Sequence, residues 1–277
     1  MLRSGIRNML RDIVELLYGV NESSGLNQSL SNFNDILFDA CMRILNYVML
    51  PAAFVILSLF FLLELQKLTT RVEAVGGSQL GVEPVIKILV KMAICVLVVT
   101  NVSTILESIY DTSVYLINQT DALLATDANA QIDMVQLERL VNNMGLGEQI
   151  VALLVSFVVW LVVVVAVLLV TLIVIGRFIE LFLLITISPL PIATIPHEEH
   201  SAIAKNFFRR FAAVSIQGIL LFLVLRFYPF IITHQLNMAD DGGNFLMMLM
   251  SLAGFAVVLI IAILGTNAMA KSIASAQ

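Results

Sequence analysis

The fold is decided between Ile150 and Pro196, where the chain reads IVALLVSFVVWLVVVVAVLLVTLIVIGRFIELFLLITISPLPIATIP. Only Arg177 and Glu180 interrupt the apolar run before the segment Ser188–Pro191 breaks it. An apolar stretch of about 20 residues is long enough for a transmembrane helix. Because proline removes a backbone donor that lipid cannot replace, we expect the break to lie inside protein or against a water-filled space.

The composition of the whole chain also indicates a membrane protein. Hydrophobic residues make up 60% of the 277 residues and charged residues 13%, with a mean hydropathy of +0.98. Soluble domains carry about 25% charged residues. Cys41 and Cys95 fall in or beside apolar segments without the spacing of a disulfide or zinc site, so we expect both to be unpaired. The chain is therefore predicted to be an all-α, polytopic transmembrane bundle.

Hydropathy divides the chain into four regions. Residues 1–32 form an N-terminal amphipathic helix and loop, and residues 33–102 hold two transmembrane helices with a basic loop. Residues 103–148 are acidic and contain a short predicted helix near 134–142; residues 149–277 hold the remaining spans, the proline-broken segment and a C-terminal tail. The amphipathic helix has two open placements, at the membrane surface or packed on its own protein.

The loop charges predict the topology. Because cytoplasmic loops carry excess Lys and Arg, the basic loops are placed inside and the acidic regions outside. This gives an external N-terminus, a cytoplasmic C-terminus and five crossings, with residues 178–196 as a re-entrant hairpin from the cytoplasmic side. A six-crossing alternative keeps the N-terminal arginines inside but also places the acidic central region there, so five crossings are favoured. The expected crossings are 44–63, 85–102, 150–176, 211–232 and 245–264.

The candidate functional residues are the ionisable residues within the apolar spans and the residues that form the break. Arg177 and Glu180 are spaced to pair on one helical face, either in a channel or simply at an interface. Arg226 could extend outward to the headgroups or line a pore. At the break, Ser188, Pro189 and Pro191 either expose carbonyls to a translocation path or form a structural kink.

Two further groups of residues are candidates for contacts with lipid, partner proteins or neighbouring helices. Arg209 and Arg210 lie among phenylalanines at the start of a span, a composition suited to anchoring at an anionic leaflet or to docking a cytoplasmic partner. Gly254 and Gly265 lie on a small-residue face of the last span. Such faces permit close helix packing, either within one chain or between subunits.

The sequence His197-Glu198-Glu199-His200 invites comparison with a metalloprotease motif. The zincin motif requires histidines at i and i+4, whereas these lie at i and i+3. The stretch is instead predicted to be a solvated helix start with acids in its first turn. With no nucleophile–base pair, carboxylate dyad or phosphate-binding loop in the sequence, we expect no catalytic residue, no metal and no cofactor.

Three segments together resemble a known family. Gly176–Glu180 (GRFIE), Ile187–Ala193 (ISPLPIA) and the polar stretch leading to Phe207–Arg210 (FFRR) are similar to the TrbL-type membrane subunit of conjugative type IV secretion systems. The short versions from mobile elements of Gram-positive bacteria are the most similar. The layout with an external N-terminus, five crossings and an acidic external region is similar to that family's topology as well.

The resemblance implies a non-enzymatic part of a DNA-transfer channel in the bacterial cell membrane. It implies a homo-oligomeric ring, with a pentamer as the expected size. The implied partners are secretion ATPases, other membrane subunits, membrane lipids and the transferred single-stranded DNA–protein substrate. The acidic region is shorter than in many members, and acids repel phosphate, so assembly or wall support suits it better than DNA binding.

Two other classes compete with this interpretation. A small secondary transporter or ion channel would use a discontinuous helix at membrane depth, but no internal repeat is visible and the spans hold few ionisable residues. A membrane-embedded enzyme would need a catalytic constellation, which the sequence does not offer.

Overall fold

The structure, a computed structural model, describes residues 2–23, 25–74, 83–125, 146–239 and 245–275. All regular elements within these ranges are helical. The short helix predicted near 134–142 and the acidic turn at 240–244 lie outside the described residues. The chain divides into two compact units, each assembled from three separate segments. Unit 1 comprises residues 1–27, 113–177 and 217–270; unit 2 comprises residues 28–112, 178–216 and 271–277.

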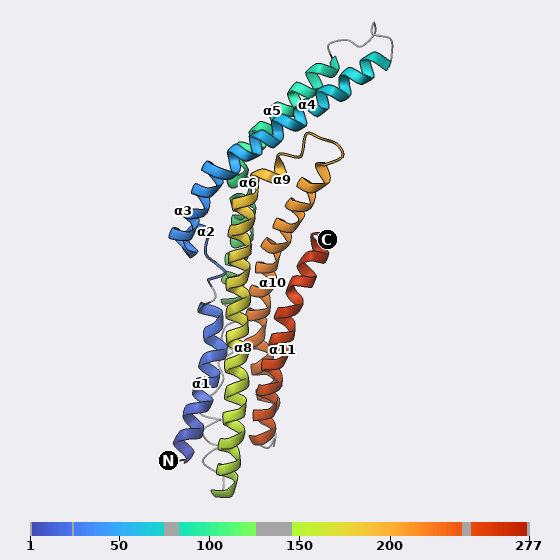
Figure 1. Ribbon diagram of the computed structural model, residues 1–277. Helices are drawn as coiled ribbons and strands as arrows, with labels where there is room; N and C mark the ends of the chain where they lie inside the picture. The colour runs from blue at the N-terminus through green and yellow to red at the C-terminus, as the bar shows by residue number, and fades with distance from the viewer. Residues whose placement is uncertain (1, 24, 75–82, 126–145, 240–244, 276–277) are drawn as a thin grey trace. The chain divides into compact units, whose positions relative to one another are not determined.

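Long helices make up most of the described chain (Figure 1). By residue number, several of them belong partly to one unit and partly to the other. Those with residues in unit 1 are α1 (Leu2–Ser23), α6 (Val102–Ala125), α8 (Leu146–Ile187), α10 (Ser201–Ala239) and α11 (Phe245–Ile273). Those that lie wholly in unit 2 are α2 (Leu30–Phe33), α3 (Asp35–Ile44), the π-helix η1 (Leu45–Met49), α4 (Leu50–Ala74), α5 (Glu83–Thr100) and α9 (Pro189–Ile192).

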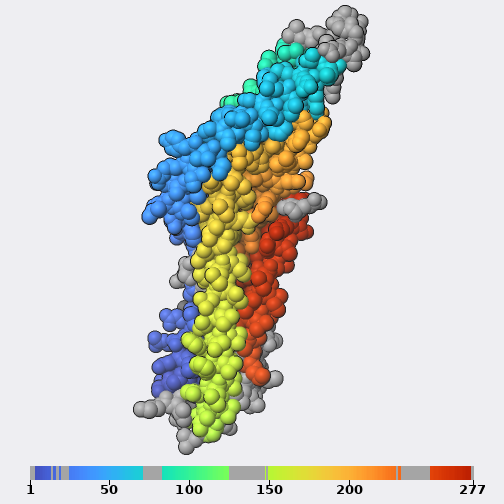
Figure 2. Space-filling model, viewed as in Figure 1, coloured from blue at the N-terminus to red at the C-terminus, as the bar shows by residue number. Residues whose placement is uncertain are grey.

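Within unit 1, α8 and α11 bury one face each through side chains that alternate in spacing between three and four residues. This spacing keeps a stripe on one side of a helix, as in coiled-coil packing. The opposite faces are apolar and exposed, as expected for helices surrounded by lipid, and Figure 2 shows the outer face of α8 as a continuous surface. The buried residues are Ala152, Ser156, Val159, Val163, Ala166 and Val170 on α8, and Leu252, Ala256, Leu259, Ile263, Thr266 and Ala270 on α11.

The N-terminal helix α1 packs on its own protein. Its apolar face is buried, with Ile6 and Ile13 at 0% and Leu10 at 3% exposure. A Cβ added at Gly5 would lie 3.2 Å from Cδ1 of Leu153 on α8, within unit 1. Of the two placements left open by the sequence, the structure therefore supports packing against the protein.

The described helices confirm the polytopic all-α class. Four are long and apolar enough to cross a membrane, and a fifth span is counted if the bent pair α5–α6 is one crossing. The two helices of that pair meet at an angle of 62°. At the bend, the Asn101 side-chain amide donates to the carbonyl of Leu97 at 2.8 Å, and the Thr100 hydroxyl donates to that of Val96 at 2.9 Å. The sequence did not reveal this bend, because Asn and Thr side chains that bond the preceding turn leave no hydropathic signal.

The predicted re-entrant hairpin over residues 178–196 differs from the structure. Its first arm is the end of α8, which runs without interruption from Leu146 to Ile187. The chain leaves this helix at Ser188, forms the single turn α9 and enters α10 at Ser201. Nothing before Pro189 removes a donor from α8, so the helix continues to the first proline, and the break connects two long helices.

Candidate functional site

The break at Ser188–Pro191 satisfies its backbone groups locally. The Ser188 hydroxyl donates to the carbonyl of Ile185 at 2.7 Å, and the Ser188 amide donates to the same oxygen at 3.2 Å. Beyond the prolines, the amide of Ala193 donates to the carbonyl of Pro189 at 3.0 Å. The Thr194 hydroxyl donates to the carbonyl of Pro191 at 2.7 Å. The carbonyl of Ile185, which loses its helical donor at Pro189, is thus engaged by Ser188, and the carbonyls of Pro189 and Pro191 are engaged by the turns that follow.

The break also lies inside unit 2, as the sequence predicted. Ser188, Ile192 and Ala193 are each 0% exposed, and α9 packs against η1, α4 and α5. Nearby, the rings of Phe33 and Phe178 stack with their centroids 3.6 Å apart. This protein-lined position meets the requirement that irregular backbone in a membrane protein be shielded from lipid.

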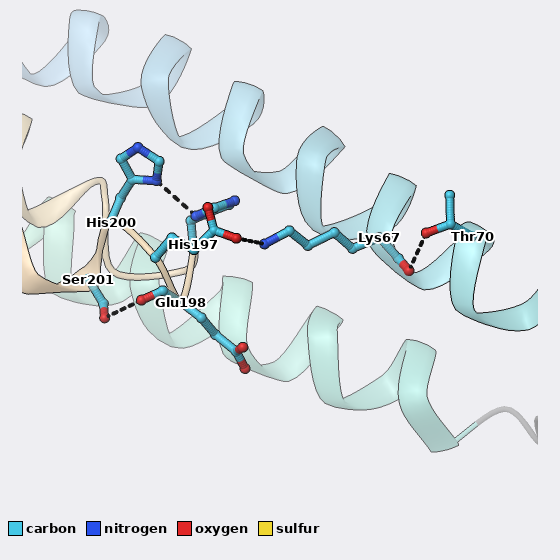
Figure 3. A network of polar contacts seen from close by, with 7 residues as sticks. Lys67, Thr70, His197, Glu198, His200 and Ser201 are labelled. Atoms are coloured by element: carbon cyan, nitrogen blue, oxygen red, sulfur yellow. Dashed lines mark hydrogen bonds and ion pairs between the residues drawn. The ribbon is translucent and has the colours of Figure 1, made fainter. Parts of the chain in front are cut away.

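The turns after the break bring two histidines together. Residues 196–200 form turns, and α10 begins only at Ser201, so the predicted helix start at His197 is wrong by four residues. In this conformation Nδ1 of His200 and Nδ1 of His197 lie 2.9 Å apart and share a hydrogen bond (Figure 3). The ring of Phe60 on α4 contacts both imidazoles, with centroid distances of 5.3 and 5.2 Å.

Lys67 on α4 forms an ion pair with Glu199 in the same turns. Its Nζ lies 3.0 Å from Oε1 of Glu199, and Figure 3 shows the lysine reaching from α4 toward the turn. The hydrogen bond and positive charge of Lys67, with a smaller contribution from His197, hold the pKa of the Glu199 carboxyl below its ordinary value. Glu199 therefore stays ionised to a lower pH than a free glutamate.

A cavity of about 260 Å³ lies beside these turns, between α4 and α5 in unit 2. Its charged lining is mixed, with three lysines and two glutamates, and the other lining residues are apolar. The charged lining residues are Lys67, Lys87, Lys91, Glu64 and Glu198. The cavity was not predicted, because the basic residues between positions 64 and 87 were assigned to one loop. In the structure these residues lie on two helices, α4 and α5.

Glu180 forms an ion pair with Arg210, an arginine that the sequence did not link to it. Its Oε1 accepts from Nη2 of Arg210 at 2.9 Å and from Nε at 3.2 Å. Glu180 and Arg210 come from α8 and α10 within unit 2, and both side chains are more than a third exposed. Sequence spacing could suggest only partners on the same helix. Arg209, the other candidate anchor, is exposed.

Arg177 is buried in unit 1, with 3% exposure. Its guanidinium lies against Gly218 of α10, so closely that a Cβ added at Gly218 would overlap it. Glycine at this position thus provides the space for a large cation between helices. The sequence identified Arg177 as unusual but contained no signal linking it to Gly218.

Arg226 finds its partner in α6. Nη2 of Arg226 donates to Oδ1 of Asp121, and both side chains are about 30% exposed (28% and 32%). The guanidinium also lies 5.7 Å from the ring centroid of Phe222. Of the two sequence alternatives, extension to the headgroups or pore lining, neither included this ion pair. Helical spacing places Asp121 one turn after the buried Ile117, but it does not identify a partner on α10.

Gly254 and Gly265 lie off the buried stripe of α11. A Cβ at either position would meet no atom within 4 Å among the described residues. Packing within one chain, one of the two interpretations of this face, is therefore not observed in the described part of the chain.

The buried break, the apolar outer faces and the two arginines within spans define a class, the polytopic α-helical membrane protein. The chain belongs to the TrbL/VirB6 plasmid conjugal transfer like protein family, whose model matches residues 21–189. The matched region takes in GRFIE at 176–180 and ends at Pro189, so FFRR at 207–210 lies beyond it. No curated protein and no solved structure matches the chain.

Proposed function

We propose that the chain is a non-enzymatic channel and scaffold subunit of a type IV secretion machine for conjugative DNA transfer. The observation that carries this proposal is the family match, which covers 169 of the 277 residues, from 21 to 189. It includes the first candidate spans and the whole of α8. Copies of the chain form a homo-oligomeric ring, with a pentamer as the expected size.

The outer face of α11 supports assembly into an oligomer. Gly254 and Gly265 leave open space on a helix whose other face is already buried. Small residues let helix backbones approach closely in lipid, where apolar burial no longer drives association. A second copy of the chain would occupy this face without displacing any contact of unit 1.

The geometry of the break favours a scaffold role for Ser188, Pro189 and Pro191. A transport path lined by carbonyls needs acceptors that remain open, as at the half-helix ends of transporters. Here the serine hydroxyl and the following turns engage the nearby carbonyls, and the segment is buried. The break therefore sets the angle between α8 and α10, and the channel lumen lies elsewhere.

The orientation follows the loop charges, with the N-terminus outside and the C-terminus in the cytoplasm. Arg209 and Arg210 are both exposed near the start of α10, where anionic cytoplasmic headgroups would attract them. The cytoplasmic side also contacts the secretion ATPases and other membrane subunits. The acidic region at 103–148 supports the wall or assembly, since its charge opposes contact with the transferred DNA.

The experiment is complementation of a deletion strain, with transfer frequency and membrane assembly measured separately. The scaffold role predicts that Pro189→Ala/Pro191→Ala lowers both, because a continuous helix would redirect α10. Intact assembly with abolished transfer would instead assign the break to the channel. If deletion of the gene left transfer unchanged, the proposed function would be wrong.

A small secondary transporter is the second candidate, and the 62° bend at Asn101 is the observation that favours it. Discontinuous helices at membrane depth are typical of transporter binding sites. Proton- or sodium-coupled uptake by the purified protein in liposomes, lost in Asn101→Ala or Asn101→Leu, would support this alternative over the conjugation subunit.

A further inference from the structure

We propose that His197, Glu199 and His200 bind a divalent transition-metal ion of the Zn²⁺ type. One ligand atom from each residue, an imidazole nitrogen or a carboxylate oxygen, lies within 4.8 Å of the other two. The site lies in the turns that follow the break, within unit 2. Two imidazoles and one carboxylate make up a ligand set that catalytic and regulatory zinc sites use.

The two histidines already present the same nitrogen to one point. Their Nδ1 atoms are 2.9 Å apart, so one nitrogen donates a proton and the other accepts it. Zn–N bonds of about 2.0–2.1 Å in tetrahedral geometry would place the two nitrogens about 3.4 Å apart. The rings need to separate by only about 0.5 Å for the ion to replace the shared proton. Because His200 is exposed and His197 is buried, the movement falls on His200.

The backbone holds this arrangement without a metal. The amide of Ser201 donates to the carbonyl of His197 at 2.9 Å, and the amide of His200 donates to it at 3.2 Å. The Thr194 hydroxyl lies 3.1 Å from the carbonyl of His200. These bonds form tight turns, which explains how histidines at i and i+3 converge although the zincin helix requires i and i+4. A site fixed before binding loses less conformational entropy when the ion arrives.

Residues of α4 supply the surroundings of the site. Phe60 packs on both imidazole rings and fixes their planes. Lys67 binds Oε1 of Glu199 at 3.0 Å, which orients the carboxylate and leaves its second oxygen for the ion. Such outer contacts position the first ligands of metal sites. The side chain of Glu199 is 71% exposed, so water can complete a fourth position.

The ligand chemistry selects the kind of ion. Imidazole nitrogen suits Zn²⁺, Ni²⁺, Co²⁺ and Cu²⁺, whereas Ca²⁺ and Mg²⁺ prefer sets made of oxygen alone. A bound ion would link residues 197, 199 and 200, in the last turn before α10. It would thereby stiffen the connection that sets the direction of α10, whatever the machine to which the chain belongs.

The test is titration of the full-length protein, purified in detergent without a histidine tag, with Zn²⁺ by calorimetry and with Co²⁺ by absorption. The expected result is one ion per chain, with affinity reduced at least 10-fold in His200→Ala and in His197→Ala and several-fold in Glu199→Gln. His234→Ala, which removes the third histidine of the sequence from α10, serves as the matched control and should leave affinity unchanged.

Folding is monitored by circular dichroism, and His200→Gln offers a milder change at an exposed position if His197→Ala unfolds. Absence of saturable Zn²⁺ binding by the wild type would overturn the proposal. Unchanged affinity in His200→Ala and His200→Gln would overturn it as well. Because the readout is metal binding, either result leaves the proposed role in DNA transfer to be decided by the transfer assay.

Discussion

Unit 1 and unit 2 place their charged side chains in different surroundings. In unit 1, Arg177 is 3% exposed, and Arg226 and Asp121 form a pair of which about 30% is exposed. In unit 2, the two long-range pairs, Lys67–Glu199 and Arg210–Glu180, have all four side chains more than a third exposed. The two units thus use the same residue types under different solvation.

This difference in exposure indicates which charged side chains have a large effect on stability. Removing an ion from water costs several kcal/mol, and only a well-placed partner offsets that cost. Exposed pairs cost little and contribute at most about 1 kcal/mol. The charges of unit 1 are therefore expected to determine stability and arrangement of the spans, whereas those of unit 2 are free to exchange partners, including a metal ion.

The largest effect is expected from breaking the pair in unit 1. Arg226→Ala leaves the partly buried carboxyl of Asp121 without this cationic partner, and should lower the free energy of unfolding by roughly 2–4 kcal/mol. Unfolding in mixed detergent micelles measures this loss. Arg209→Ala, at an exposed position of the same helix, is the control. The exchange Asp121→Arg/Arg226→Asp should recover part of the loss; equal losses in all three variants would show that the pair does not matter.

A smaller effect is expected where Gly218 makes room for Arg177. Alanine normally stabilises a helix interior over glycine by about 1 kcal/mol, and Gly176→Ala, with open space around it, should show this gain. Gly218→Ala should instead destabilise by about 1–3 kcal/mol, because its Cβ overlaps the buried guanidinium. Combination with Arg177→Met removes the overlap, so a double-mutant cycle should show strong coupling. Additive changes would contradict the contact.

A still smaller effect is expected in unit 2. Arg210→Ala removes the exposed pair with Glu180 and should change the free energy of unfolding by less than about 1 kcal/mol. The same micelle experiment compares it directly with Arg226→Ala. If Arg210→Ala lost as much free energy of unfolding as Arg226→Ala, the ion pairs of the two units would not differ in their contribution to stability.

The smallest effect concerns pH. Because Lys67 holds the pKa of Glu199 below its ordinary value, the pair contributes stability at pH above that ordinary value and loses it as the pH falls through the lowered pKa. Hydrogen exchange of residues 193–200 should therefore differ between wild type and Glu199→Gln at neutral pH, and the two should converge in acid. A difference that grows on acidification would have the wrong sign.

Much of the fold could be predicted because lipid imposes strict rules. Apolar runs of span length and the charge of loops gave the polytopic all-α class, and the prolines marked where α8 ends. The bend at Asn101 escaped prediction because it depends on side-chain bonds to the preceding turn. The hairpin was predicted to begin at residue 178, whereas α8 is continuous to Ile187. Hydropathy cannot distinguish the end of one long helix from a separate re-entrant arm.

The site was harder to predict because its contacts join residues far apart in the sequence. Arg177 and Arg226 stood out as ions in apolar spans, yet their neighbours Gly218 and Asp121 lie 41 and 105 positions away along the chain. The histidines were set aside by a spacing rule that applies to helices, whereas they lie in turns. Domain boundaries and the sides of the membrane remain predictions from hydropathy and loop charge.

The central claim, that copies of this chain assemble in the membrane through the open face of α11, is tested most directly by cysteine crosslinking. The background is Cys41→Ala/Cys95→Ala, which removes both natural thiols. In native membranes, Gly254→Cys and Gly265→Cys are each predicted to give a crosslinked dimer, the largest product that one thiol per chain allows, whereas Leu259→Cys, on the buried face, is predicted to stay monomeric. Monomers alone from both glycine positions would contradict the account.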